Sequence, residues 1–174
     1  MISIRPARPD EAPALTALAL RSKAHWGYDA GFMSACIPEL TVILDGIRKH
    51  PMYVAVEDGR PVGFYNLEPI ADGDLASLAA SGGAQPGDRA AELVFLFVEP
   101  EFIGRGCGAI LVRHAKETAR DLGFAALVIQ GDPHAAGFYE AMGAVQVGSK
   151  ESGSVSGRRL PVYRIDLHEE RAEG

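Results

Sequence analysis

Three alternating glycines between an apolar segment and an amphipathic one constrain this chain more than any other feature of its sequence. Residues 92–98 are almost entirely apolar, Gly104, Gly106 and Gly108 follow, and residues 106–122 carry apolar side chains at helical spacing. This order predicts a buried strand, a sharp turn and a helix. Backbone N–H groups of a glycine-rich turn can converge on an anion, and a helix N-terminus favours negative charge. One interpretation is therefore a phosphate site, and the other is a turn made only for close packing.

The best-known phosphate-binding patterns do not match this turn. The dinucleotide fingerprint needs G-x-G-x-x-G with an acidic residue about 20 positions later, and the P-loop needs Gly-Lys followed by Ser or Thr. The glycines here stand at every second position, and no Gly-Lys-Ser or Gly-Lys-Thr occurs in the chain. A pyrophosphate at this turn would need a different fold.

Around the turn the chain alternates short strands with helices. The boundaries come from apolar periodicity, from the turn dipeptide Asp58-Gly59 and from capping residues. We expect strands at 2–5, 52–57, 61–68, 92–100, 124–130, 144–147 and 160–167, and helices at 10–22, 29–38, 43–49, 106–122 and 132–141. Hairpins combined with two strand–helix units favour an α/β fold, a single sheet of mixed and mostly antiparallel direction flanked by helices.

Several of these boundaries depend on single residues. We expect Asp10 and Asp29 to cap the first two helices and Pro38 to end the second. The run from 93 to 98 is apolar at every position, so we expect it to be buried on both faces. The inward face of the first helix is predicted to carry Leu15, Leu18, Ala19 and Ser22, and that of residues 106–122 to carry Ile110, Leu111, Ala115, Thr118, Ala119 and Leu122.

The length of 174 residues fits one domain, which we place at residues 1–168. Residues 69–90 are rich in Ala, Gly, Asp and Ser, and we expect a mobile insertion loop that is either functional or merely disordered. Residues 169–174 are expected to be a solvated tail.

Composition excludes several classes of function. The net charge is -6 and the basic residues are scattered, which argues against a nucleic-acid partner. No apolar stretch approaches 18 residues, so no membrane partner is expected. Cys36 and Cys107 form no CxxC pair, and the five histidines are far apart without metal-ligand spacing, so we expect no metal. We infer a reduced, soluble, cytoplasmic protein. Its acidity favours a cationic small substrate but is also common among cytoplasmic proteins.

Two motifs resemble those of the GNAT acetyltransferase superfamily. The segment VEPEFIGRGCGAILV is similar to the family's acetyl-CoA motif [QR]xxGx[GA], with Gly106 and Gly108 at its two small positions and Ile103 where Gln or Arg is usual. Downstream, DPHAAGFYEAMGA is similar to NxxAxxFYxxxGF, with Asp132 at the Asn position and Tyr139 at the tyrosine. One helix and one strand separate the two motifs, as in the family.

The resemblance implies an acyl-CoA N-acyltransferase fold in which two central strands splay apart and the pantetheine arm of acetyl-CoA lies between them. Acetyl-CoA is the implied cosubstrate, and its pyrophosphate would bind N–H groups of the glycine turn. The implied cofactor-binding residues are Phe97, Val98, Ile103, Gly104, Arg105, Gly106, Cys107, Gly108, Ala109, Asp132, His134 and Tyr139. The side chain of Cys107 itself is expected to act as a small buried hydrophobe.

Acetyl transfer to an amine needs a base and an acid. The resemblance makes Tyr139 the candidate acid for the departing thiolate, with packing on a helix face as the alternative. Glu92 is the candidate base, because it begins an apolar strand where partial burial would raise its pKa. Its alternative is a charged residue in solvent at a strand end, and Glu68 and His134 are the reserve bases.

The resemblance implies that the acceptor is a primary amine of a small molecule or peptide. His25, Trp26 and Tyr28 stand where the family builds its acceptor pocket, and their rings could hold a cation. A hydrophobic contact between helices is the other interpretation. The implied activity is N-acetylation by direct attack in a ternary complex, with a homodimer conceivable from the family. A catalytically silent acyl-CoA-binding domain on the same fold is the main rival, and acyl transfer to a hydroxyl is a further one.

Overall fold

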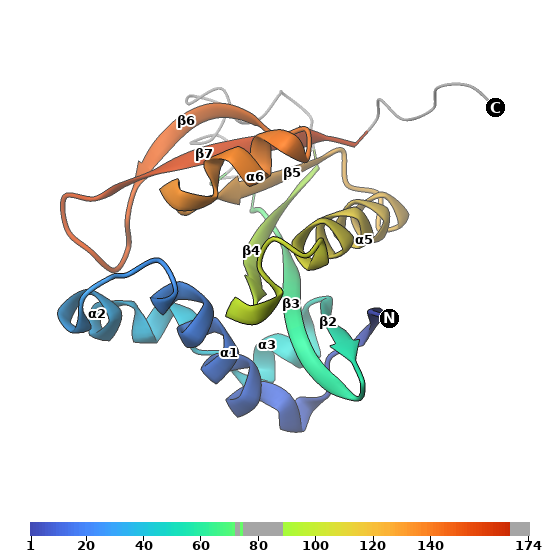
Figure 1. The fold of residues 1–174 in the computed structure, drawn as a ribbon. Helices are drawn as coiled ribbons and strands as arrows, with labels where there is room; N and C mark the ends of the chain where they lie inside the picture. The colour runs from blue at the N-terminus through green and yellow to red at the C-terminus, as the bar shows by residue number, and fades with distance from the viewer. Residues whose placement is uncertain (72–73, 75–88, 168–174) are drawn as a thin grey trace. The chain divides into compact units, whose positions relative to one another are not determined.

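The computed structural model describes residues 1–71, 74 and 89–167, and Figure 1 shows their arrangement. The predicted loop at 69–90 and the tail at 169–174 therefore lie mostly or wholly outside the described residues. The elements are β1 (Ser3–Pro6), η1 (Pro9–Glu11), α1 (Ala12–Ala24), α2 (Ala30–Leu40), α3 (Leu44–Lys49), β2 (Met52–Glu57), β3 (Arg60–Pro69), β4 (Ala90–Val98), η2 (Pro100–Phe102), α5 (Cys107–Asp121), β5 (Ala126–Gln130), η3 (Pro133–Ala135), α6 (Ala136–Ala141), β6 (Val145–Glu151) and β7 (Arg159–Asp166), where η marks a 3-10 turn.

These elements belong to two compact units. The first comprises Met1–Asn66, Phe95–Arg113 and Gly153–Gly157, and the second comprises the described parts of Leu67–Val94, His114–Ser152 and Arg158–Gly174. Strands β3 and β4 each contribute residues to both units. The two units are described separately below.

The strands hydrogen-bond in the order β1-β2-β3-β4-β5-β7-β6. In the first unit, β1 pairs antiparallel with β2 and β2 pairs antiparallel with β3. In the second, β4 pairs parallel with β5, whereas β7 pairs antiparallel with both β5 and β6. The expected α/β class with a mixed, mostly antiparallel sheet is confirmed.

The turn between β2 and β3 follows the sequence prediction. Asp58 has a φ of 50° and Gly59 a φ of 76°. Two consecutive positive φ values make a two-residue hairpin turn whose twist matches that of the strands, and Asp-Gly readily adopts it.

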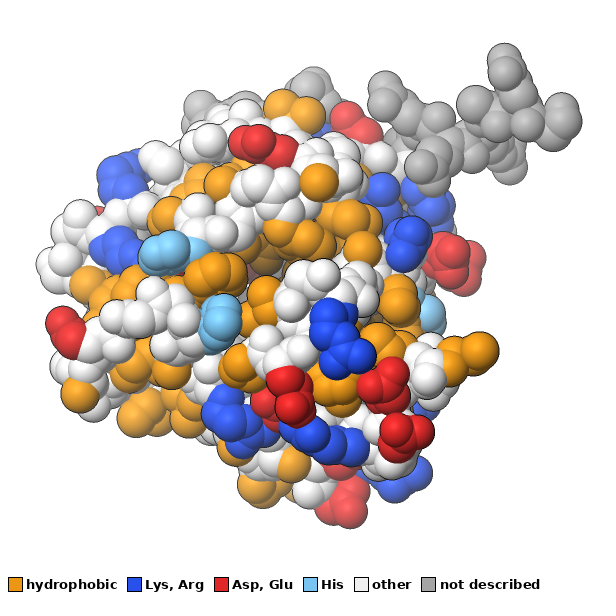
Figure 2. Space-filling view, viewed as in Figure 1, with side chains coloured by type: hydrophobic (Ala, Val, Ile, Leu, Met, Phe, Trp, Pro, Cys, Tyr) orange, Lys and Arg blue, Asp and Glu red, His pale blue; other side chains and the backbone are white. Residues whose placement is uncertain are grey.

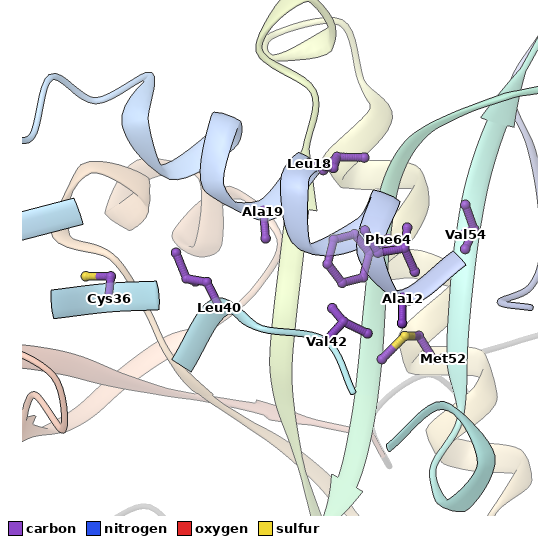
Figure 3. Close-up of a cluster of buried hydrophobic side chains, with 10 residues drawn as sticks. Ala12, Leu18, Ala19, Cys36, Leu40, Val42, Met52, Val54 and Phe64 are labelled. Atoms are coloured by element: carbon purple, nitrogen blue, oxygen red, sulfur yellow. The ribbon is translucent and has the colours of Figure 1, made fainter. Parts of the chain in front are cut away.

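The core of the first unit packs α1 and α2 on β2 and β3. Figure 3 shows side chains from these four elements pointing toward one another. Leu15, Leu18 and Ala19 of α1 are no more than 1% exposed, and Ser22 is also buried. The predicted inward face of the first helix is thus confirmed, and burial of this stripe is what holds the helix.

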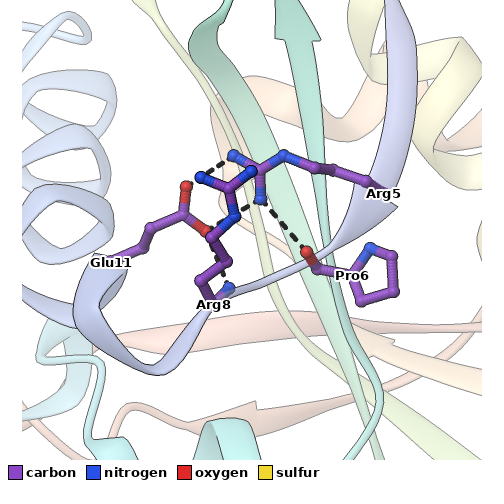
Figure 4. Close-up of polar contacts among 4 residues, drawn as sticks. All are labelled: Arg5, Pro6, Arg8 and Glu11. Atoms are coloured by element: carbon purple, nitrogen blue, oxygen red, sulfur yellow. Dashed lines mark hydrogen bonds and ion pairs between the residues drawn. The ribbon is translucent and has the colours of Figure 1, made fainter.

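Two of the predicted helix boundaries are wrong. The first turn is stabilised by Glu11 rather than Asp10: its carboxylate accepts bonds of 3.0 and 2.6 Å from the Arg5 guanidinium and one of 2.8 Å from the Arg8 N–H (Figure 4).

Pro38 lies inside α2, which continues to Leu40. Only two residues follow the proline in the helix, and the Thr41 hydroxyl donates to the Ile37 carbonyl at 2.7 Å, so a carbonyl of the last turn keeps a partner. Asp29 does cap α2, accepting from the Phe32 N–H at 2.8 Å.

The buried face of α5 is Cys107, Leu111, Val112, Ala115 and Ala119. The prediction is right for Leu111, Ala115 and Ala119, holds in part for Ile110 and Thr118, which are half-buried, and is wrong for Leu122, which is 46% exposed. Gly123 explains the difference: its φ of +85° ends the helix at Asp121, so Leu122 lies in the capping turn rather than on the helical face.

Figure 2 shows acidic and basic side chains interspersed on the face drawn, with apolar groups between them. This mixture agrees with the scattered charges of the sequence. Among the described residues, no helix is long and apolar enough to span a bilayer.

Substitution of Gly63 tests how closely β3 and the start of α5 pack. A Cβ at this position would lie 2.9 Å from Leu111 Cδ1, 3.0 Å from the Phe97 carbonyl oxygen and 3.2 Å from Cys107 Sγ. Because one of these neighbours is backbone, Gly63→Ala should lower the free energy of unfolding by about 1–3 kcal/mol, as measured by urea denaturation.

Gly137 in α6 is the matched control. A Cβ there would have no heavy atom within 4 Å, so Gly137→Ala should leave stability unchanged or raise it by up to about 1 kcal/mol. Equal losses in the two variants would contradict this account of Gly63.

Candidate active site

The glycine turn is built as the sequence predicts. After β4 and η2, Gly104 has a φ of +77° and Gly106 a φ of +86°, and α5 begins at Cys107. These left-handed conformations are strained for residues with a Cβ, so glycine is needed at both positions. The Ile110 N–H donates to the Gly106 carbonyl at 3.1 Å, the first bond of the helix. The N–H groups of Cys107, Gly108 and Ala109 precede it and need acceptors from outside the helix, as an anion can supply.

At this turn the backbone N–H groups are the main candidate donors to an anion, because the neighbouring side chains are engaged in other contacts or buried. The Arg105 guanidinium lies over the Phe102 ring, with 4.6 Å between Cζ and the ring centroid. Cys107 is fully buried, and burial, followed by the charge of Glu57, raises the pKa of its thiol to about 11. The thiol is therefore protonated at neutral pH, which confirms the expected small hydrophobe rather than a nucleophile. Ile103 is half-buried.

Strand β4 is less buried than its sequence predicts. Within the second unit its parallel register with β5 covers only Ala90, Ala91 and Glu92, although β5 continues to Gln130. Val94 is 37% exposed. The expectation of burial on both faces is wrong because the pairing ends early. A strand edge without its neighbour can bind an extended ligand through backbone hydrogen bonds.

In the first unit, the C-terminal part of β4 packs against the hydrophobic core. Phe97 packs against Phe64 and Phe95, with ring centroids 6.0 and 6.2 Å apart, and remains half-buried, as does Val98. The side chain of Phe97 is thus a core group, and any contact of Phe97 and Val98 with a cofactor would come from the backbone.

Tyr139 lies in a tight aromatic contact in the second unit. Its ring centroid is 5.4 Å from that of Tyr163 on β7, and it is 7% exposed. A Cβ on Gly131 would lie 2.9 Å from Tyr163 and 3.0 Å from Tyr139, so glycine is required beside both rings. Burial, then the charges of Asp132 and Tyr163, raises the pKa of Tyr139. The phenol therefore keeps its proton at neutral pH but is a weaker acid than an exposed tyrosine, and it packs as a core residue.

Asp132 caps the 3-10 turn η3 and makes contacts that the sequence did not predict. Its carboxylate accepts from the His134 N–H at 2.9 Å and lies 3.0 Å from His134 Nδ1. Arg158, which follows β6 in the chain, places its guanidinium 3.6 Å from the other carboxylate oxygen. Such a contact between distant residues has no local sequence pattern.

Glu92 is half-buried rather than solvated, so the alternative of a free strand end is wrong. Its carboxylate accepts a bond of 3.2 Å from the Gln130 amide. Burial is the main cause that raises its pKa, with Glu68 and Asp74 acting in the same direction and Lys150 and Gln130 opposing them. A carboxylate with a raised pKa is a stronger base, which suits proton abstraction near neutral pH. The reserve candidate Glu68 thus acts on Glu92 through its charge.

The predicted aromatic group divides into two pairs in the first unit. His25 and Trp26 meet edge to face at 5.2 Å, whereas Tyr28 stacks on Phe32 at 4.0 Å. The Lys23 ammonium lies 5.3 Å from the Tyr28 centroid and 5.9 Å from the Phe32 centroid. Phe32, which the sequence analysis did not include in this group, is half-buried and completes the stack around the Lys23 ammonium.

The predicted site residues thus fall in both units. The glycine turn, the end of β4 and the aromatic pairs belong to the first, and Glu92, Asp132, His134 and Tyr139 belong to the second. In the part of the chain that the structure describes, no three His, Cys, Asp or Glu side chains gather as metal ligands.

Solved structures with similar folds include acetyltransferases. The PaiA N-acetyltransferase of Thermoplasma acidophilum, in complex with coenzyme A, has a TM-score of 0.71 at 18% identity, covering 95% of this chain and 99% of that one. A GNAT family acetyltransferase of Brucella melitensis, in complex with acetyl-CoA, has a TM-score of 0.60 at 21% identity, covering 95% and 88%.

The sequence comparisons agree with the fold. The model of the acetyltransferase (GNAT) family matches residues 20–144. The peptidyl-lysine N-acetyltransferase YjaB of Salmonella typhimurium is 30% identical over 167 residues, which cover 95% of this chain and 97% of that protein. As its two motifs predicted, this chain belongs to the acetyltransferase (GNAT) family, whose members are N-acetyltransferases that use acetyl-CoA.

Proposed function

We propose that this protein transfers the acetyl group of acetyl-CoA to the side-chain amine of a lysine in a peptide or protein. We infer the class of acceptor from the similarity, over 95% of the chain, to a peptidyl-lysine N-acetyltransferase. The stack of Tyr28 and Phe32, which contacts the Lys23 ammonium, could hold a positively charged side chain that neighbours the acceptor lysine in such a peptide. A small-molecule amine is the alternative acceptor.

Acetyl-CoA is proposed to bind at the glycine turn and along β4. The N–H groups of Cys107, Gly108 and Ala109, which precede the first bond of α5, would receive the pyrophosphate together with those of Gly104 and Gly106. Arg105 adds positive charge to the same turn. The resemblance to the family assigns the pantetheine arm to the backbone of Phe97 and Val98, and further cofactor contacts to Ile103, Asp132 and His134.

The chemistry is proposed to proceed by direct attack in a ternary complex. The lysine nitrogen forms a bond to the acetyl carbon while the carbon–sulfur bond breaks. Glu92, directly or through water, accepts the proton that the amine loses, and Tyr139 donates a proton to the departing CoA sulfur. The raised pKa of Glu92 makes it a stronger base and supports its role. The raised pKa of Tyr139 lies above that of a thiol and opposes proton donation, so the assignment of Tyr139 as the acid rests on the family resemblance and not on its pKa.

Localisation and assembly follow the same proposal. We expect the protein to act in the cytoplasm, where acetyl-CoA is available and where Cys36 and Cys107 remain the free, buried thiols that the structure contains. A homodimer is an expectation taken from the family alone.

The acceptor class is tested by incubating the purified protein with acetyl-CoA and one of two matched peptides, one with a central lysine and one with arginine in its place. Thiol release should depend on the lysine peptide, and mass spectrometry should find one added acetyl group on its side chain. Turnover with polyamines or amino acids but with no lysine peptide would contradict the acceptor class. Tight CoA binding without turnover on any amine would instead support the catalytically silent domain, and turnover on hydroxyl acceptors would support the third candidate.

Tyr139→Phe tests the acid. The substitution keeps the ring that packs on Tyr163 but removes the proton, so kcat should fall by about a hundredfold or more while the Kd for CoA stays within about twofold. Steady-state kinetics and calorimetric titration measure the two quantities. An unchanged kcat would eliminate the role and leave Tyr139 as a packing residue, and Tyr163→Phe is the control for hydroxyl loss in the same aromatic contact.

Glu92→Gln tests the base through its pH dependence. Below the raised pKa of Glu92 both the carboxyl and the amine must lose a proton, so log(kcat/KM) of the wild type should rise with a slope of about two, and above it with a slope of about one. The variant should be slower by about a hundredfold and have a slope of about one throughout. Parallel profiles would exclude Glu92 as the base.

The stability of the same variant provides an independent check. Because folding raises the pKa of Glu92, the folded state binds more protons than the unfolded state above about pH 4.3, so ionising Glu92 lowers stability as pH rises. The free energy of unfolding of Glu92→Gln relative to the wild type should therefore increase from about pH 4 through the raised pKa, as measured by urea denaturation in a pH series.

A further inference from the structure

Glu99 is a buried carboxylate at the point where β4 leads into the glycine turn. The residue is 4% exposed, and both of its carboxylate oxygens accept from the Arg21 guanidinium, Nε to Oε2 at 3.2 Å and Nη2 to Oε1. Arg60 Nη2 lies 3.9 Å from Oε1. The bidentate bond joins α1 to the end of β4 across a sequence separation of 78 residues.

The backbone of Glu99 is fixed as firmly as its side chain. Its N–H donates to the Val62 carbonyl of β3 at 2.8 Å, and its carbonyl accepts from the Phe102 N–H of η2 at 2.8 Å. All of these groups belong to the first unit. Glu99 therefore joins α1, β3 and η2 five residues before Gly104, and its position sets where the glycine turn begins.

Net stability is a weak explanation for this ion pair. Removing a carboxylate from water costs free energy that the Coulomb attraction barely repays, and a well-packed apolar pair is often as stable. What a bidentate arginine–carboxylate pair adds is a fixed geometry, because two parallel hydrogen bonds define both distance and orientation. A phosphate site made of backbone N–H groups needs this property, since a displacement of about 1 Å is enough to weaken binding strongly.

We propose that Arg21 and Glu99 are positioning residues that hold the glycine turn in the conformation that binds the CoA pyrophosphate. The inference rests on the proposed binding of acetyl-CoA at that turn. The pair itself touches neither the cofactor nor the acceptor: it acts through the backbone of η2 and of residues 103–106. Its loss should therefore raise the KM for acetyl-CoA and leave kcat at saturating cofactor largely unchanged.

The same unit offers a matched control. Arg5 and Glu11 also form a bidentate, partly buried pair, with bonds of 3.0 and 2.6 Å (Figure 4). This pair secures η1 before α1 and has no described hydrogen bond to η2 or to residues 103–106. Loss of either arginine leaves a glutamate with fewer partners, so the comparison separates general destabilisation from an effect on the turn.

The test compares Arg21→Met with Arg5→Met, using calorimetric titration of CoA, KM and kcat for acetyl-CoA, and thermal unfolding. Arg21→Met should weaken CoA binding by about tenfold, within the range typical of coupling between neighbouring groups. Arg5→Met should stay within about twofold of the wild type at a similar loss of melting temperature. Arg21→Lys, which keeps the charge but not the two parallel bonds, should give an intermediate Kd.

Coupling between the two residues gives a second readout. If Arg21 and Glu99 act as a unit, Glu99→Gln and the double variant Arg21→Met/Glu99→Gln should have about the same Kd for CoA as Arg21→Met, whereas independent effects would multiply. Should Arg21→Met fail to fold, Arg21→Lys and Arg5→Lys supply the same comparison.

Three outcomes overturn the inference. These are an unchanged Kd in the Arg21 variants, equal losses of affinity in the Arg21 and Arg5 variants, and multiplicative effects in the double variant. CoA binding by the wild type is measured first and distinguishes the two levels of the argument. Its absence would overturn the proposed cofactor site and the positioning role with it, whereas binding that is insensitive to Arg21 overturns the positioning role alone.

Discussion

The left-handed backbone at Gly104 and Gly106 is the constraint on which the proposed cofactor site depends. These two residues allow the chain to reverse from β4 into α5 within a few positions, and the helix consequently begins with N–H groups that have no acceptor inside it. Gly63 adds a second condition, because only a residue without a Cβ lets β3 approach both the Phe97 carbonyl and the first turn of α5 this closely. The proposed anion-binding end of α5 thus depends on three missing side chains on two segments that are far apart in the sequence.

Burial acts on Glu92 and Tyr139 in the same direction and with opposite chemical consequences. Each group is charged only after it loses its proton, so desolvation raises both pKa values. For the carboxylate this means a greater affinity for the proton that the amine loses, which strengthens the proposed base. For the phenol it means a weaker acid, because its pKa lies above that of the thiol whose thiolate it would protonate. The same physical cause therefore favours the proposed role of Glu92 and opposes that of Tyr139.

Local sequence patterns predicted most of the fold and the family, but they predicted few of the contacts around the candidate site. The Asp58-Gly59 hairpin, the inward face of α1 and the glycine turn each depend on residues within a few positions of one another, and all were predictable. The early end of the β4–β5 pairing was not, because an apolar run has the same sequence whether or not a neighbouring strand covers it. Tyr163 beside Tyr139, Arg158 beside Asp132 and Arg21 on Glu99 were also missed, since each contact joins residues that only the folded chain brings together.

The stack of Tyr28 and Phe32 bears on how an acceptor lysine would react. An aromatic face stabilises an ammonium and not a neutral amine, as its contact with Lys23 illustrates, so it opposes the deprotonation that acetyl transfer requires. If the reacting amine bound there, the base would have to overcome that stabilisation in addition to the ordinary lysine pKa of about 10.4. The stack is therefore better suited to holding a positively charged neighbour of the reacting lysine than to binding the nucleophile.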